Sequence, residues 1–185
     1  IIKIEGPCYI RLGKSDSPII TKEKAPLEVG MANIIRFRKE SKNFVDAFDY
    51  YLSSDYKSED ESLAIIACGL MVSEAMRAAY ILKKEYKIET RVINMHTIKP
   101  LDESAIKKIA EEIGSVIVVE EHLTGGLGNL ISKVMMDVGN RKTKKFKMVG
   151  VEDKFAKSGD PNDLIKYFKL DAENLVNIAI KEFKL

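Results

Sequence analysis

Two unbroken apolar runs, Leu63 to Cys68 and Val116 to Val119, constrain the fold of this chain more than any other feature. Strands that are apolar on both faces are typical of parallel sheets covered by helices on each side. Around these runs, apolar residues recur at three- to four-residue spacing, which predicts amphipathic helices. The alternation of strands and helices predicts an α/β/α sandwich with a mostly parallel sheet.

The predicted helices carry start and stop signals. One apolar stripe runs from Val72 to Tyr86. A second begins after Asp102, a residue type favoured at the N-cap, and ends at Gly114, a residue type favoured just past a helix. The remaining helices are expected from Leu127 to a stop at Gly139, from Asp160-Pro161, and from Asp171 to Phe183.

Three further strands are predicted. Ala32 to Arg38 alternates, with Ile35 and Phe37 on one face and Arg36 and Arg38 on the other, as in a half-exposed edge strand. Arg91 to Met95 and Phe146 to Val151 give weaker strand patterns.

Two segments depart from the alternation of strands and helices. Residues 1–20 read as two short strands with a turn, and 21–26, which hold a proline and several charges, read as a linker. Because two short strands cannot bury a core alone, we expect residues 1–20 to pack against another part of a longer protein. Residues 40–61 are expected to form a helix and a loop inserted after the first strand of the main domain, 27–185.

Charge and hydropathy exclude several function classes. The 30 basic and 28 acidic side chains nearly balance, so nothing favours nucleic acid or an anionic membrane as a partner. No apolar run reaches the roughly 18–20 residues that span a bilayer, and no secretory signal is visible. Cys8 and Cys68 lie in apolar runs, which predicts buried thiols and a cytoplasmic location.

Gly125, Gly126 and Gly128 follow a predicted strand and open a predicted helix, so their backbone N–H groups could hold an anion. The spacing is not the dinucleotide-binding fingerprint. The alternative, which the pattern favours, is a tight turn that lets the helix pack close to the sheet.

Glu120, Glu121 and His122 end the same strand, at the edge where open α/β sheets bind ligands. Glu121 and His122 are candidates for an acid–base pair or for an interface with a neighbouring domain. His96 ends another strand and could approach His122. No third ligand has suitable spacing, so a metal site is not expected.

Two groups of basic residues remain. Arg11 and Lys14 flank a turn, and such a pair suits phosphate, because Arg binds it bidentately and Lys as a point charge. Residues 141–147 hold five basic residues, which we interpret as a solvated loop. No nucleophile elbow, phosphate-binding P-loop or zinc motif is present.

Six strings in order resemble the transketolase family. The first is similar to the closing strand and turn of the pyrimidine-binding domain, the second to the entry strand of the C-terminal domain, and the other four to its successive strand-end motifs. The strings are Gly6–Lys14, Glu28–Arg36, Ile65–Ala75, Val92–Asp102, Val118–Gly128 and Gly150–Gly159.

The resemblance implies a three-layer α/β/α domain with a five-stranded mixed sheet whose first strand is antiparallel at one edge. It implies a parent enzyme that moves a two-carbon ketol unit between sugar phosphates of the pentose phosphate pathway, using thiamine diphosphate and Mg²⁺. In the family, the diphosphate and the metal lie on the first domain, and the glutamate that activates the cofactor lies on the second. No catalytic residue and no bound cofactor are therefore expected in this chain. What carries over is a substrate-phosphate position at Arg11 and Lys14.

The implied partners are the N-terminal, cofactor- and pyrimidine-binding part of a transketolase, on the same or a separate chain, and a second copy in a homodimer. The C-terminal domains of 1-deoxyxylulose 5-phosphate synthase and of the beta chain of 2-oxo acid dehydrogenases are similar alternatives. A regulatory anion-binding module and a purely structural dimerisation domain are alternatives from other classes.

Overall fold

The computed structural model describes residues 3–13, 16–123, 125–153 and 155–185. Its strands and helices alternate along most of the chain, as the apolar runs and helical stripes predict. In chain order the elements are β1 (Asn33–Phe37), the 3₁₀ turn η1 (Phe44–Ala47), β2 (Phe48–Leu52), β3 (Leu63–Ala67), α1 (Met71–Tyr86), β4 (Thr90–Asn94), α2 (Glu103–Glu112), β5 (Ser115–Leu123), α3 (Leu127–Met136), β6 (Lys145–Val151), α4 (Pro161–Tyr167), α5 (Ala172–Asn177) and the π-helical turn η2 (Ile178–Glu182).

The strands form one mixed sheet in the order β2-β1-β4-β3-β5-β6. Strands β4, β3, β5 and β6 are parallel, and β1 is antiparallel to both of its neighbours. The three-layer α/β/α class is therefore confirmed, and so is the antiparallel first strand. The strand count of five and the edge position of β1 are wrong, because β2 adds a sixth strand outside it.

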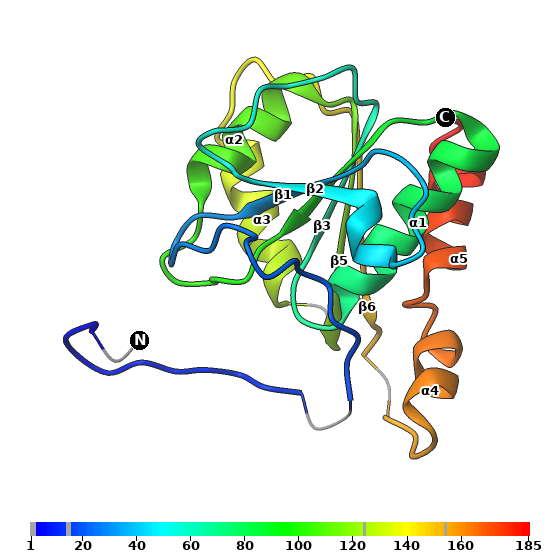
Figure 1. Ribbon diagram of the computed structural model, residues 1–185, viewed down its shortest axis with the longest axis horizontal. Helices are drawn as coiled ribbons and strands as arrows, with labels where there is room; N and C mark the ends of the chain where they lie inside the picture. Colours follow the sequence, from blue (N-terminus) through cyan, green and yellow to red (C-terminus); the bar gives the residue numbers. More distant parts are fainter. Residues whose placement is uncertain (1–2, 14–15, 124, 154) are drawn as a thin grey trace.

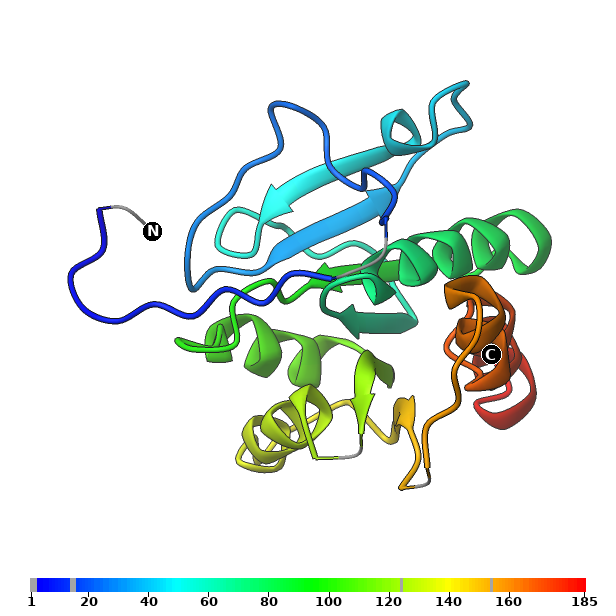
Figure 2. The ribbon, with the colours of Figure 1, turned by 90° about the horizontal axis from the view of Figure 1, so that it is seen from below.

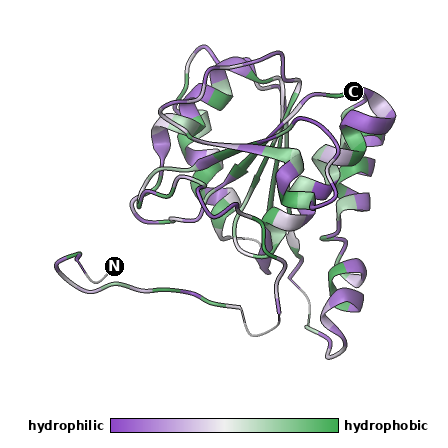
Figure 3. Ribbon diagram, in the orientation of Figure 1, coloured by the Kyte–Doolittle hydropathy of each residue, from purple (hydrophilic) through white to green (hydrophobic). Residues whose placement is uncertain are grey.

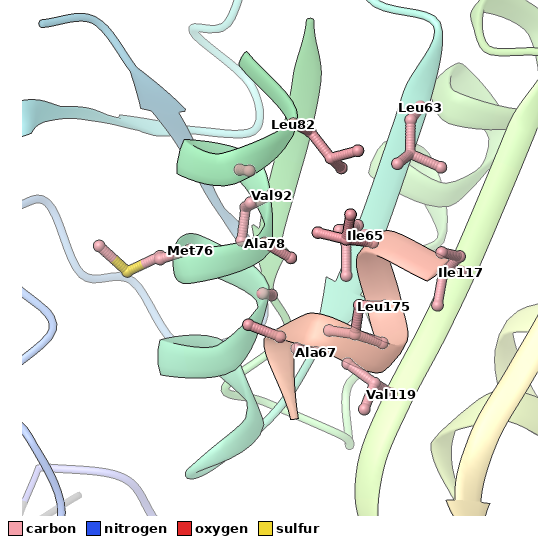
Figure 4. Close-up of a cluster of buried hydrophobic side chains, with 14 of the residues drawn as sticks. Leu63, Ile65, Ala67, Met76, Ala78, Leu82, Val92, Ile117, Val119 and Leu175 are labelled. Atoms are coloured by element: carbon pink, nitrogen blue, oxygen red, sulfur yellow. The ribbon is translucent and has the colours of Figure 1, made fainter. Parts of the chain in front are cut away.

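Helices cover both faces of the sheet, α1 and α5 on one and α2 and α3 on the other (Figures 1 and 2). On the first face, Ile65 of β3 and Ile117 of β5 are fully buried against α1 and Leu175 of α5 (Figure 4). On the second, Ile66 and Val118 pack against α2 and α3. The central strands are thus apolar on both sides, which the hydropathy colouring shows in the middle of the fold (Figure 3).

The inserted segment 40–61 is not the helix and loop that its spacing predicts. Only Phe44–Ala47 turn as a short 3₁₀ helix, and Phe48–Leu52 form strand β2. The apolar positions from Phe44 to Leu52 fit helical spacing, but Phe48 also fits the two-residue alternation of a strand, together with Tyr50. Strand β2 pairs with β1 over all five of its residues, and this pairing decides between the two patterns.

Strand β1 alternates as predicted but is buried on both faces, so the half-exposed interpretation is wrong. Arg36 is only 1% exposed, because the loop after β2 covers its face with Tyr56 and Glu61. The Glu61 carboxylate lies 2.8 Å from Nη2 of Arg91 and 3.4 Å from Nη1 of Arg36. We call Arg36, Glu61 and Arg91 the ionic cluster.

Several partners complete the ionic cluster. The Tyr56 hydroxyl donates to Glu61, and the Arg91 guanidinium lies 4.9 Å from the centre of the Tyr56 ring. Glu112 and Glu89, both partly exposed, pair with Arg91 at 2.9 Å and with Arg36 at 3.1 Å. Burial opposes the charge of Glu61, but the hydrogen bonds from Arg91 and Tyr56 hold the pKa of its carboxyl below the ordinary value. Buried charges persist when they are paired in this way.

Asp102 caps α2 as predicted, and it also joins three parts of the sandwich. Its carboxylate accepts the backbone N–H of Ala105 at 3.0 Å, in the first turn of α2. It also accepts the N–H of Ala32 beside β1 at 2.8 Å and the hydroxyl of Ser53 after β2 at 2.5 Å. The caps at Asp160 and Asp171 are confirmed as well.

The N-terminal residues 3–13 and 16–20, which we call the arm, form no strand in the structure, so the two strands predicted there are wrong for the described residues. The arm runs away from the sandwich (Figure 1). Its apolar side chains are exposed, with Tyr9 at 89%, Leu12 at 83% and Ile19 at 81%. Cys8 is exposed too, which corrects the prediction of a buried thiol, whereas Cys68 is partly buried.

Within the described residues, the structure contains no helix with the length and apolar character required to cross a membrane.

Candidate functional site

The carboxyl ends of β3, β4 and β5 meet at one edge of the sheet, which we call the carboxyl edge. The residues after β3 and β4 there are Cys68 and His96, and β5 itself carries Glu120, Glu121 and His122. In open α/β sheets this edge is where ligands bind. The structure thus brings the polar residues singled out in the sequence to the expected place.

Arg11 is the arm residue that reaches this edge. Its guanidinium Nη2 donates to the backbone carbonyl oxygen of Glu121 over a long 3.5 Å. Lys14, the other predicted phosphate-binding residue, lies outside the described residues. Because Glu121 is 110 residues further along the chain, no local sequence pattern indicates this contact.

Cys68 lies close enough to these charges to be affected by them. Burial raises the pKa of the Cys68 thiol to about 11, and the negative charge of Glu120 adds to the shift. The positive charge of Arg11 acts in the opposite direction. A thiol with a raised pKa is a poor nucleophile at neutral pH, so we assign Cys68 no catalytic role.

The glycine turn between β5 and α3 is built around the side chain of Glu120. The backbone N–H of Gly128 donates to Glu120 Oε1 at 3.3 Å. A Cβ atom at Gly126 would lie 2.4 Å from Glu120 Oε2, and Gly125 adopts a φ of +124°. At Gly128 a Cβ would lie 2.6 Å from Sδ of Met148 in β6.

Close packing therefore accounts for Gly126 and Gly128, and the positive φ accounts for Gly125. The carboxylate of Glu120 already occupies the N-terminus of α3, where the positive end of the helix dipole favours an anion. An external anion at Gly125, Gly126 and Gly128 would have to displace it. The sequence places Glu120 at this edge of the sheet, but its hydrogen bond to the first turn of α3, eight residues later, was not predicted.

His96 and His122 do not form a joint site among the described residues. His96 Nδ1 lies 2.9 Å from Thr97 Oγ1. Burial lowers the pKa of His96, so the imidazole is neutral at pH 7. His122 is exposed, and no hydrogen bond between the two rings occurs in the described part of the chain.

A cavity of about 330 Å³ opens beside the glycine turn, between β6 and the α4–α5 segment. Its charged lining is mixed, with Glu120, Lys147 and Lys169 among the contributors. Lys147 is already paired with Glu182 of η2 at 2.9 Å. No group of three or more His, Cys, Asp or Glu side chains in the described ranges is arranged to hold a metal ion.

The basic run 141–147 is partly a strand and not wholly the predicted loop, because Lys145 and Lys147 belong to β6. Lys145 donates to the carbonyl oxygen of Phe183, and Lys147 pairs with Glu182. Both lysines therefore attach the edge strand to the C-terminal helical segment.

Comparison with known proteins gives consistent matches. Residues 53–175 match the family model described as transketolase, C-terminal domain. A transketolase C-terminal section from Methanocaldococcus jannaschii is 35% identical over 187 residues, which cover 100% of this chain and 50% of that protein. Transketolase from Rattus norvegicus is 30% identical over 179 residues, 96% of this chain and 25% of that protein.

A solved structure named as a split-gene transketolase, an inactive β4 tetramer, superposes with a TM-score of 0.75 at 29% identity. The superposition covers 99% of this chain and 52% of that one. The chain thus spans about half the length of the M. jannaschii relative and a quarter of rat transketolase.

Proposed function

The chain belongs to the transketolase family, through its C-terminal domain, and on that premise we propose that it is the non-catalytic C-terminal part of a transketolase. In this role it contributes to assembly and to binding of the substrate phosphate. The parent enzyme transfers a two-carbon ketol unit between sugar phosphates. Residues 1–20 are the tail of the pyrimidine-binding domain, 21–26 the linker and 27–185 the C-terminal domain, with an insertion at 40–61.

One observation carries the proposal. The similarity to the M. jannaschii C-terminal section extends over the whole chain, arm included, yet accounts for only half of that protein. The arm also exposes large apolar side chains such as Tyr9 and Leu12. Exposed apolar surface of this kind is typical of segments that bind another protein surface. The missing surface is supplied by the cofactor-binding part of the enzyme.

The glycine turn, which is the candidate anion site of this chain, does not fit the diphosphate of thiamine diphosphate. A diphosphate requires free donors, and the helix N-terminus at the glycine turn is filled by Glu120. Mg²⁺ is usually bound through one or two carboxylates together with the phosphates of a bound ligand, so we place its site with that of the diphosphate. We therefore assign both groups to the partner part of the enzyme and derive no step through them here.

Assembly tests this proposal. We expect the chain to form a complex with the N-terminal, cofactor-binding section of a transketolase when the two are mixed. Size-exclusion chromatography with light scattering measures the mass of the complex and, for the chain alone, reports whether it forms the expected homodimer. Elution of the two proteins at their separate masses at all concentrations would contradict the assembly.

Arg11 supplies the second test, in the assembled enzyme. Replacing Arg11 with alanine is expected to raise the KM for phosphorylated acceptors by roughly ten- to a hundredfold, because a charge-assisted contact contributes about 1.5–3 kcal/mol. Lys14→Ala is the parallel variant, and Lys3→Ala, on the exposed part of the arm, is the control.

The measurement is steady-state kinetics with phosphorylated and unphosphorylated acceptors. A contact with the phosphate raises the KM for the phosphorylated acceptor alone. Equal effects on both acceptors, or no effect from either Arg11 or Lys14, would remove these residues from the substrate site.

A further inference from the structure

The base of the arm is held by the inserted strand β2. The hydroxyl of Tyr50 donates to the carbonyl oxygen of Ile20 at 2.8 Å. The Lys22 ammonium donates to the carbonyl oxygen of Phe48 at 2.6 Å and lies 5.6 Å from the centre of the Tyr50 ring. Two side chains thus join residues 20–22 to a strand about 30 positions later in the sequence. We call this set of contacts the tether.

The strand that carries the tether is itself firmly fixed. Phe48 is fully buried, and its ring packs edge-on against Phe37 of β1, with centres 5.5 Å apart. Strand β2 pairs with β1 along its full length. Ile20 packs on the apolar cluster that includes Phe48. The tether therefore connects the base of the arm to a rigid part of the sheet.

Beyond the tether the arm has little contact with the sandwich. Ile19, the next residue outward, is 81% exposed, and Tyr9 and Leu12 are exposed to a similar degree. The contact of Arg11 with Glu121 is long, at 3.5 Å. The direction in which the arm leaves the domain is therefore set chiefly at residues 20–22.

The tether lies outside the segment that matches the family model, which begins at residue 53, after β2. We propose that the insertion at 40–61 is a positioning element, which holds residues 20–22 on β2 and so orients the arm for docking onto the rest of the enzyme. This inference rests on the proposed function, since it takes the cofactor-binding part as the partner.

Restricting the arm before docking raises affinity, because less conformational freedom is lost when the partner binds. Each hydrogen bond of the tether favours the tethered arm severalfold, and the bond from the charged Lys22 favours it more than the neutral one from Tyr50. Removing both is expected to shift the arm toward untethered conformations by at least about tenfold.

The test uses the full chain with Tyr50→Phe and Lys22→Met combined, which removes both donors and keeps most of the apolar stems. The matched control combines Tyr51→Phe and Lys24→Met. Tyr51 is the next residue of β2, with its hydroxyl on Asp49 and Arg38, and Lys24 is exposed. A nitroxide is attached at Ile19→Cys, with Cys8 and Cys68 replaced by serine and alanine.

Electron paramagnetic resonance of the isolated chain then reports the mobility of the label. We expect a mobile component to grow in the tether variant and to stay unchanged in the control. Far-ultraviolet circular dichroism verifies that both variants are folded. Identical spectra in the tether variant and the parent would overturn the tether itself, whatever the function of the chain.

The second measurement is the Kd for the N-terminal section. The tether variant is expected to bind about tenfold more weakly than the control. If the parent chain does not bind at all, the proposed function fails. The resonance spectra still show, independently of binding, whether the tether holds the base of the arm. If the arm becomes mobile and the Kd is unchanged, the tether exists but does not serve docking, and the inference is wrong.

Discussion

The purified 185-residue chain is expected to show no ketol transfer in the presence of thiamine diphosphate and Mg²⁺, and activity is expected to appear when a cofactor-binding section is added. The reason is chemical, since the cofactor carries the carbanion chemistry of such a reaction. The residues that would hold and activate it belong, on our proposal, to the other part of the enzyme.

The assay follows transfer from a ketose phosphate to an aldose phosphate at increasing ratios of the two proteins. Activity should rise with this chain and reach a plateau at a fixed stoichiometry. The cofactor-binding section alone, and that section with heat-denatured chain, are the controls. Turnover by the chain alone would contradict its assignment as a non-catalytic part.

Replacing Glu61 with glutamine is expected to lower the free energy of unfolding by about 3 kcal/mol, the lower end of the range for breaking a buried ion pair. The change leaves Arg36 and Arg91, each 1% exposed, without the carboxylate between them. Glu89 and Glu112 remain within 3.1 Å and 2.9 Å of the two guanidinium groups, so the loss is not larger.

Urea denaturation at pH 7 measures this effect. Glu103→Gln is the matched control, because its carboxylate pairs with Lys107 at 3.2 Å on the exposed face of α2. An exposed helical pair of this kind is worth less than about 0.5 kcal/mol. Equal denaturation midpoints for the two variants would show that the ionic cluster does not stabilise the fold.

The Glu61 carboxylate also makes the free energy of unfolding depend on pH in the acidic range. The pKa of Glu61 is lower in the folded protein than its ordinary value of 4.5. The stability that ionised Glu61 adds to the folded protein is therefore fully present above pH 4.5 and is lost as the pH falls through the folded pKa. Glutamine does not titrate, so the stability of the variant should decrease less steeply over that acidic range.

Most of the architecture could be predicted from the sequence, because its dominant patterns are local. The apolar run at Leu63 and the helical stripe after Val72 each follow one periodicity without interruption. The caps at Asp102 and Asp171 are also local, since each bonds a backbone N–H three residues later. Elements of this type are specified by neighbouring residues.

The errors concern features that depend on distant residues. Phe48 fits both the helical spacing that starts at Phe44 and the strand alternation with Tyr50, and only pairing with β1 decides between the two. Arg36 follows an alternation typical of a solvent-facing residue, but Glu61, 25 positions later, supplies the charge that allows it to be buried. Neither partner can be identified from the local pattern.

The candidate site was predictable to the same extent. Strand ends indicated the carboxyl edge, and Glu121 and His122 lie there. The contact between Arg11 and Glu121 and the capping of α3 by Glu120 depend on side-chain directions that periodicity does not give. The assignment of Arg11 to a phosphate rests on family resemblance, and the kinetic comparison above tests it.

The position of the ionic cluster has a consequence for how such a protein can evolve. Arg91 is the second residue of β4 and Glu61 precedes β3, so the cluster lies at the end of the sheet opposite Glu121 and the arm contact. Substitutions more than about 7–10 Å apart with no shared partners usually have additive effects. Selection for heat or acid tolerance can therefore act on the cluster, while selection on substrate or partner acts at the other end, with little interference between the two.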